Sequence, residues 1–87
     1  MQDEILIVAD EHMIVQTVKE MLESRGYRVT CCTRCLEALE MVQQNPKKFD
    51  LVITDFLMPQ MNGFGLAQEL TRLRPNLLLS FIRPSTM

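Results

Sequence analysis

The sequence predicts an α/β domain built on a doubly wound, open parallel sheet with helices on both faces. Continuous apolar runs rich in β-branched residues alternate with amphipathic segments of helical period, and this strand–helix unit occurs three times before a last apolar run. Strands that alternate with helices pair in parallel, because each helix crosses over the sheet between them. The 87 residues leave room for one domain, 1–87.

The first strand–helix unit occupies the first 26 residues. Residues 5–9 read Ile-Leu-Ile-Val-Ala, and a run without polar residues predicts a strand buried on both faces. The next segment predicts a helix of about 12 to 14 residues, with apolar side chains at helical spacing: Ile14, Val18, Met21 and Leu22. Gly26 suits the position just past this helix, because glycine tolerates a positive φ angle.

The second unit follows the same plan. Residues 27–32 alternate and are rich in strand-forming residues, which predicts a second strand. The helix after it is marked by an apolar stripe and ends at Asn45-Pro46; the stripe contains Leu36, Leu39 and Val42.

The third unit begins with a strand at residues 49–54 and places Asp55 at the carboxyl end of that strand. A loop rich in proline, asparagine and glycine follows. The third helix closes at Arg74-Pro75 and has four apolar positions, Phe64, Ala67, Leu70 and Leu73. Residues 77–82 are the fourth strand candidate.

Net charge and the length of the apolar runs argue against a nucleic-acid partner and a membrane partner. Nine basic and eleven acidic residues give a net charge of −2, so the domain has no basic footprint for nucleic acid. No apolar run approaches the roughly 18 to 20 residues of a membrane span, and acidic residues follow Met1, unlike the basic start of a signal peptide. We therefore expect no nucleic-acid or membrane partner for this segment, and a cytoplasmic location.

Three cysteines, Cys31, Cys32 and Cys35, form one cluster. An odd number so close together is a poor disulfide framework, so we expect reduced thiols that pack as small hydrophobic groups. A zinc site is disfavoured, because it needs about four ligands and the only histidine, His12, lies on a different predicted element.

Polar side chains follow the predicted strands at their carboxyl ends, where an open α/β sheet collects its ligands. Asp10 and Glu11 follow the first strand, Asp55 follows the third, and Ser80 lies near the end of the fourth. Two neighbouring carboxylates repel each other unless a cation lies between them, and Mg²⁺ is typically held by one or two carboxylates together with phosphate oxygens. Asp10 and Asp55 therefore predict a magnesium site with room for a phosphoryl group, which Asp55 could accept as a nucleophile.

The loop after the third strand carries a specific motif. Residues 55–63 read Asp-Phe-Leu-Met-Pro-Gln-Met-Asn-Gly, which resembles the Asp-x-x-Met-Pro-x-Met-Asp/Asn-Gly signature of response-regulator receiver domains, the phosphoacceptor modules of two-component signalling. The first strand, which ends in Val-x-Asp-Glu, and the Leu-Glu-Ala-Leu of the second helix fit the same family, so the resemblance covers residues 4–82. It implies the flavodoxin-like fold of this family.

The resemblance also implies a role for each matching position. Asp55 matches the phosphoacceptor and Asp10 the acidic residue that coordinates Mg²⁺, while the backbone carbonyl of Leu57 matches the third protein ligand. Ser80 matches the hydroxyl residue that hydrogen-bonds the phosphoryl group and moves inward as a switch. The expected phosphodonor partner is a sensor histidine kinase or a phosphotransfer protein.

Two departures from the family pattern accompany these matches. Ala9 stands where a first acidic residue is usual, so weaker binding of Mg²⁺ is expected. Nothing supplies the lysine that ends the family's fifth strand, and the resemblance implies a domain truncated after the fourth strand, without the fourth helix, fifth strand and fifth helix. Lys47 and Lys48 belong to a loop far from the predicted strand ends.

The leading hypothesis is a receiver domain that takes a phosphoryl group onto Asp55, a signalling domain and not an enzyme in the ordinary sense. The alternative is a non-catalytic receiver-like fragment that dimerises or binds a partner through the edge of its fourth strand, whose residues 77–82 form an apolar run. Hydrolases that also use a strand-end aspartate normally carry a second aspartate two residues on, where this chain has Leu57.

Overall fold

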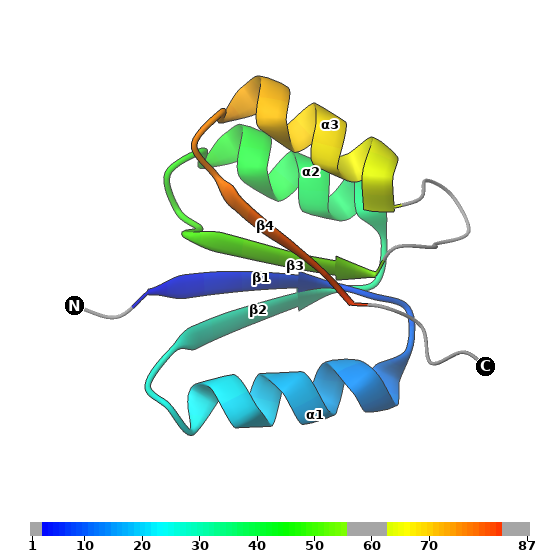
Figure 1. Ribbon diagram of the computed structural model, residues 1–87, viewed down its shortest axis with the longest axis vertical. Helices are drawn as coiled ribbons and strands as arrows, with labels where there is room; N and C mark the ends of the chain where they lie inside the picture. The colour runs from blue at the N-terminus through cyan, green and yellow to red at the C-terminus, as the bar shows by residue number, and fades with distance from the viewer. Residues whose placement is uncertain (1–2, 56–62, 83–87) are drawn as a thin grey trace.

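The computed structural model describes residues 3–55 and 63–82, except the side chains at 63, 64, 81 and 82, and contains a parallel four-stranded sheet (Figure 1). In chain order its elements are β1 (Glu4–Val8), α1 (His12–Glu23), β2 (Arg28–Cys32), α2 (Cys35–Gln44), β3 (Leu51–Asp55), α3 (Gly63–Leu73) and β4 (Leu78–Ile82). The strand order is β2-β1-β3-β4, and every neighbouring pair is parallel. The predicted doubly wound α/β fold is confirmed.

The helices form a layer on each side of the sheet. Helix α1 packs against β1 and β2 on one face, whereas α2 and α3 pack against each other on the opposite face (Figure 1). The chain therefore runs outward from β1 to β2, crosses back over β1, and continues through β3 to β4. Its direction switches between β1 and β3, and the crevice at such a switch point is where open α/β sheets bind their ligands.

Strand β1 and the residue after it are buried from both sides, as the apolar run predicted. Leu6 and Val8 belong to the core under α2 and α3, while Ile5, Ile7 and Ala9 belong to the core under α1. Successive side chains of a strand point to opposite faces, so this alternation follows from the pleat of the strand. An uninterrupted apolar sequence is needed here because neither face meets water.

The buried faces of the helices differ in part from the predicted stripes. Three predicted core positions are exposed, Met21 by 52%, Leu36 by 56% and Leu73 by 39%. Val42 of α2 and Leu70 of α3 are buried, as their stripes predicted. The other buried helix residues among the described side chains are Val15 of α1, Cys35 and Ala38 of α2, and Leu66 of α3. Each helix has adjacent apolar residues, so spacings of three and four residues fit two stripes about 100° apart, and packing against the sheet selects one.

Two loops precede strands of the sheet, one between α1 and β2 and one between α2 and β3. Gly26 follows α1 with a φ angle of +94°, the left-handed conformation predicted for this position. Arg74, just past α3, donates from Nη1 to the carbonyl oxygen of Pro46 at 3.1 Å and also to that of Phe49. Its guanidinium thereby joins the loop after α3 to the loop that leads into β3.

Strands β2 and β4 are the two edges of the sheet. Leu78 on β4 is 66% exposed, although it belongs to an apolar strand. Within residues 3–55 and 63–82, no helix combines the length and the apolar character that crossing a membrane requires.

Candidate functional site

The register of β1 and β3 brings the two predicted carboxylates to one point on the sheet. Val8 lies opposite Thr54, so the next position of β1, Ala9, faces Asp55, and Asp10 follows one residue later. Adjacent strands are about 4.8 Å apart, and the chain direction switches between these two strands. Asp10 and Asp55 therefore follow neighbouring strands at the same carboxyl edge of the sheet, where open α/β sheets bind their ligands.

The two carboxylates differ in exposure. Asp55 is the last residue of β3 and only 9% exposed, whereas Asp10 is exposed in the bend after β1. Thr54 is fully buried, and its Oγ1 donates a hydrogen bond to the carbonyl oxygen of Asp55 at 3.1 Å. The backbone that carries Asp55 is thus held from within the sheet, while Asp10 meets solvent.

The thiol of Cys35 is a neighbour of this site that the sequence analysis did not find. The backbone N–H of Ala9 donates to the carbonyl oxygen of Cys32 at 3.1 Å, so the end of β1 lies beside the turn from β2 into α2. Cys35 begins α2 and is buried. Burial, and then the negative charge of Asp10, raise the pKa of the Cys35 thiol. Only the pairing of β1 with β2 reveals this proximity.

Burial raises the pKa of all three cysteine thiols. Burial raises the pKa of Cys32 to about 11 and also raises that of Cys31. Cys32 donates from Sγ to Sδ of Met41 at 3.4 Å within the core under α2 and α3. In the part of the chain that the structure describes, no three side chains of histidine, cysteine, aspartate or glutamate are grouped to hold a metal. Cys32 and Cys35 pack as buried hydrophobic residues, as the sequence predicted.

The donor set at the strand ends suits a hard divalent cation. Asp10 and Asp55 offer carboxylate oxygens from adjacent strands, and Mg²⁺ is commonly bound by one or two carboxylates plus phosphate oxygens and water. Buried Ala9 adds no ligand beside them. The predicted third ligand, the carbonyl of Leu57, lies outside the described residues. The residues present fit Mg²⁺, with two side-chain ligands.

Ser80 lies within β4. It is the third residue of the five-residue strand β4 and pairs with Ile53, whereas the residue opposite Asp55 is Ile82. Two strand residues span about 7 Å, so Ser80 is set back from the edge that carries the carboxylates. The role of its hydroxyl at the phosphoryl group stays a prediction.

Comparisons with known proteins agree with this geometry. The family described as the response regulator receiver domain matches residues 5–82. The response regulator receiver protein CpdR of Brucella abortus is 36% identical over 78 residues, which are 90% of this chain and 63% of CpdR. The sensor kinase CckA of the same organism is 33% identical over 78 residues, or 90% of this chain and 8% of CckA. A CheY-like receiver structure from Methanospirillum hungatei is 28% identical with a TM-score of 0.90, covering all of this chain and 68% of that one.

The chain belongs to the response regulator receiver domain family. Receiver domains are signalling domains of two-component systems that interact with sensor kinases and phosphotransfer partners, and as a family they bind Mg²⁺. This chain spans less than two thirds of CpdR and a small part of CckA.

Proposed function

We propose that this chain is a phosphoacceptor in which Asp55 receives a phosphoryl group from the phosphohistidine of a sensor histidine kinase or phosphotransfer protein, in a Mg²⁺-dependent reaction. The observation that carries the proposal is that buried Asp55 ends β3 and exposed Asp10 follows the adjacent strand β1, at the switch point between these two strands. Its similarity to CpdR, and to part of the sensor kinase CckA, supports such a partner. The proposal includes a cytoplasmic location for this chain.

Each acidic residue has its own part in the proposed reaction. A carboxylate oxygen of Asp55 bonds to phosphorus while the phosphorus–nitrogen bond of phosphohistidine breaks, and the imidazole nitrogen keeps the electron pair of that bond. Asp10, together with Asp55 and the Leu57 carbonyl, would hold Mg²⁺, whose charge offsets that of the phosphoryl oxygens. The 9% exposure of Asp55 limits the approach of water to the acyl phosphate that forms.

Intact-mass spectrometry after incubation with Mg²⁺ and acetyl phosphate tests this proposal. The wild type should gain the mass of one phosphoryl group, and chelation of Mg²⁺ should prevent the gain. Asp55→Asn should abolish the adduct, while Asp50→Asn, at the residue just before the opposite end of β3, should keep it. An adduct that persists in Asp55→Asn, or no adduct on the wild type, would contradict the proposal.

The role of Ser80 in contacting the phosphoryl group stays a prediction, and the same experiment tests it through Ser80→Ala. Because the resemblance implies that the Ser80 hydroxyl hydrogen-bonds the phosphoryl group, we expect its removal to shorten the lifetime of the aspartyl phosphate. An unchanged lifetime would contradict this role for Ser80.

A second candidate function is self-association or partner binding through the open edge of β4. Exposed Leu78 favours it, because no further strand of the described residues pairs with β4 and an apolar edge strand is a template for another strand. The two functions are compatible, because the β4 edge and the carboxylates are separate surfaces.

A further inference from the structure

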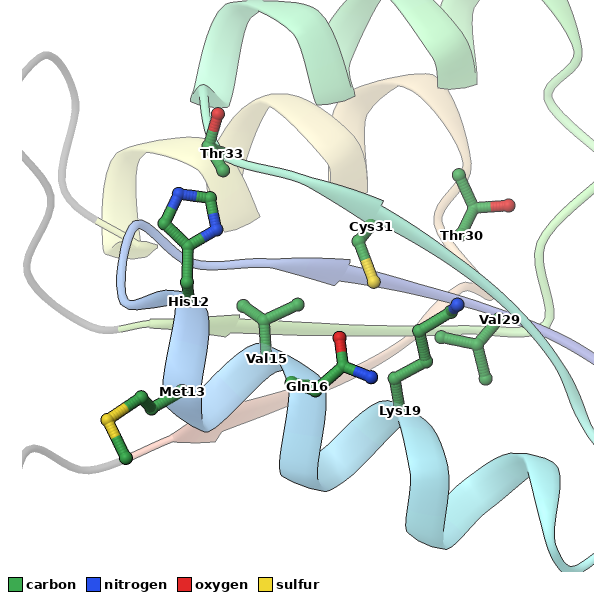
Figure 2. A pocket seen from close by; sticks show the side chains of 9 residues that line it. All are labelled: His12, Met13, Val15, Gln16, Lys19, Val29, Thr30, Cys31 and Thr33. Carbon is green, nitrogen blue, oxygen red and sulfur yellow. The ribbon is translucent and has the colours of Figure 1, made fainter.

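A groove lies between helix α1 and the edge strand β2 (Figure 2). Its volume is about 710 Å³. His12, Gln16 and Lys19 share one side of α1, spaced by four and three residues, and rise from the helix toward β2 (Figure 2). Val29 and Cys31 form the opposite wall. We call this cavity the β2 groove.

Among the residues that the structure describes, no further strand pairs with the outer edge of β2 beside this groove. The N–H of Arg28 donates to the carbonyl oxygen of Asp3, and the carbonyl oxygen of Cys32 accepts from Ala9, so both residues turn their backbone groups toward β1. In a parallel ladder alternate residues face the same neighbour. The backbone N–H and C=O of Val29 and Cys31 therefore point away from β1, toward the open edge.

The residues that carry these outward-facing backbone groups also line the β2 groove. Val29 and Cys31 are partly buried against the core under α1 and also line the groove. A strand that paired with their backbone would turn every second side chain toward α1, into the groove, and the others toward the face that carries Arg28. One set of side chains of the added strand would therefore lie in the largely apolar groove, and the other set would face solvent.

The charges around this edge select the chemistry of the incoming strand. No carboxylate lines the β2 groove, whereas Lys19 does; Lys19 Nζ lies 3.7 Å from Glu23 Oε2, a partly exposed pair. Arg28 at the start of β2 and Arg34 just beyond its end are exposed, and neither makes an ion pair with any other described residue. The edge thus has two unpaired guanidinium groups flanking an apolar centre.

We propose that the β2 edge binds an extended peptide segment of a partner protein in which acidic and apolar residues alternate. The apolar side chains would enter the β2 groove and the acidic ones would face Arg28 and Arg34, a recognition by strand addition. A second copy of this chain is a poorer occupant, because pairing β2 with β2 gathers four arginines at one seam. The proposal goes beyond the phosphoacceptor function and does not depend on it.

Fluorescence anisotropy with a labelled peptide of about eight residues, alternating glutamate and valine, tests this proposal. We expect saturable binding by the full chain. A peptide of alternating lysine and valine should not bind, and N-methylation of every second amide in the glutamate peptide should abolish binding by removing the donors that pair with β2. Amide NMR signals of Val29 and Cys31 should shift during the titration.

Variants of the chain locate the site. Arg28→Glu should weaken binding at least about threefold, while Arg72→Glu, an equal charge change on α3, should stay within about twofold. Asp55→Asn should bind like the wild type, which separates this site from the acceptor site. The proposal is overturned if binding is not saturable, if the N-methylated or lysine peptide binds equally well, if Arg28→Glu and Arg72→Glu behave alike, or if the shifts map away from β2.

Discussion

Ala9 ends the apolar run of β1 directly beside the two carboxylates. Its methyl group is buried with Ile7 and Val15 under α1, and its N–H holds the adjoining turn through Cys32. The residue therefore favours the stability of the sheet while leaving the site with only two acidic side chains. A third carboxylate at this position would increase the attraction for a cation, and it would bring repulsion and desolvation when no cation is bound.

Ala9→Asp should bind Mg²⁺ about tenfold more tightly than the wild type, a gain of about 1.4 kcal/mol, because cation affinity rises with the charge of the ligand set. Isothermal titration calorimetry measures the affinity. Without Mg²⁺ the same variant should unfold at a lower temperature than the wild type, and added Mg²⁺ should recover part of the loss, since a ligand bound only by the folded state stabilises it.

Ala9→Asn is the matched control for this prediction. It adds a side chain of similar size without the charge, so it should lose stability without gaining affinity for Mg²⁺. Equal Mg²⁺ titrations for the aspartate and asparagine variants would show that position 9 does not contribute to the cation site.

At the scale of the elements, the sequence pattern predicted the order and type of every helix and strand. The positions of Asp10 and Asp55 could also be predicted from the sequence. Alternating strands and helices imply a switch point, and these two residues follow the strands on either side of it. The register of β4, which pairs Ser80 with Ile53, could not be predicted, because a run of apolar residues does not reveal how it pairs with its neighbour. Leu36 was assigned to the core for a similar reason, since its neighbour Cys35 fits the helical period equally well.

Leu66→Ala tests which face of α3 supports the fold. Leu66 is fully buried in the core under α2 and α3, so its truncation should lower the free energy of unfolding by about 2 to 5 kcal/mol. Leu36→Ala, which truncates an exposed leucine of α2, should cost less than about 1 kcal/mol. Urea denaturation followed by far-UV circular dichroism measures both values. An unfolded Leu66→Ala chain would agree with the prediction, and equal stabilities of the two variants would contradict it.

At the scale of the whole molecule, the sheet has two edges of different character. β2 lies next to a groove, begins with Arg28 and is followed by Arg34. β4 exposes Leu78 and contains no charged residue. Charged side chains at an edge oppose pairing between copies, and apolar ones permit it. Self-association is therefore expected at β4 and not at β2.

Size-exclusion chromatography with light scattering at increasing concentration tests self-association through β4. The average mass of the wild type should rise toward that of a dimer. Leu78→Lys should weaken the dimer at least tenfold, by about 1.4 kcal/mol, because a lysine on an edge strand opposes strand pairing. Leu36→Lys, an equal change on the exposed surface of α2, should leave the dimer intact. A wild type that stays monomeric throughout would rule out this interface.

The order β2-β1-β3-β4 has a consequence for how such a domain can change over evolutionary time. The two acidic residues follow the inner strands, whose backbone groups are already paired on both sides, while the unpaired backbone belongs to the outer strands. Substitutions that alter an outer edge therefore leave the frame of the acidic pair in place. Recognition of partners can diversify on the rim of this sheet while the chemistry at its centre is inherited unchanged.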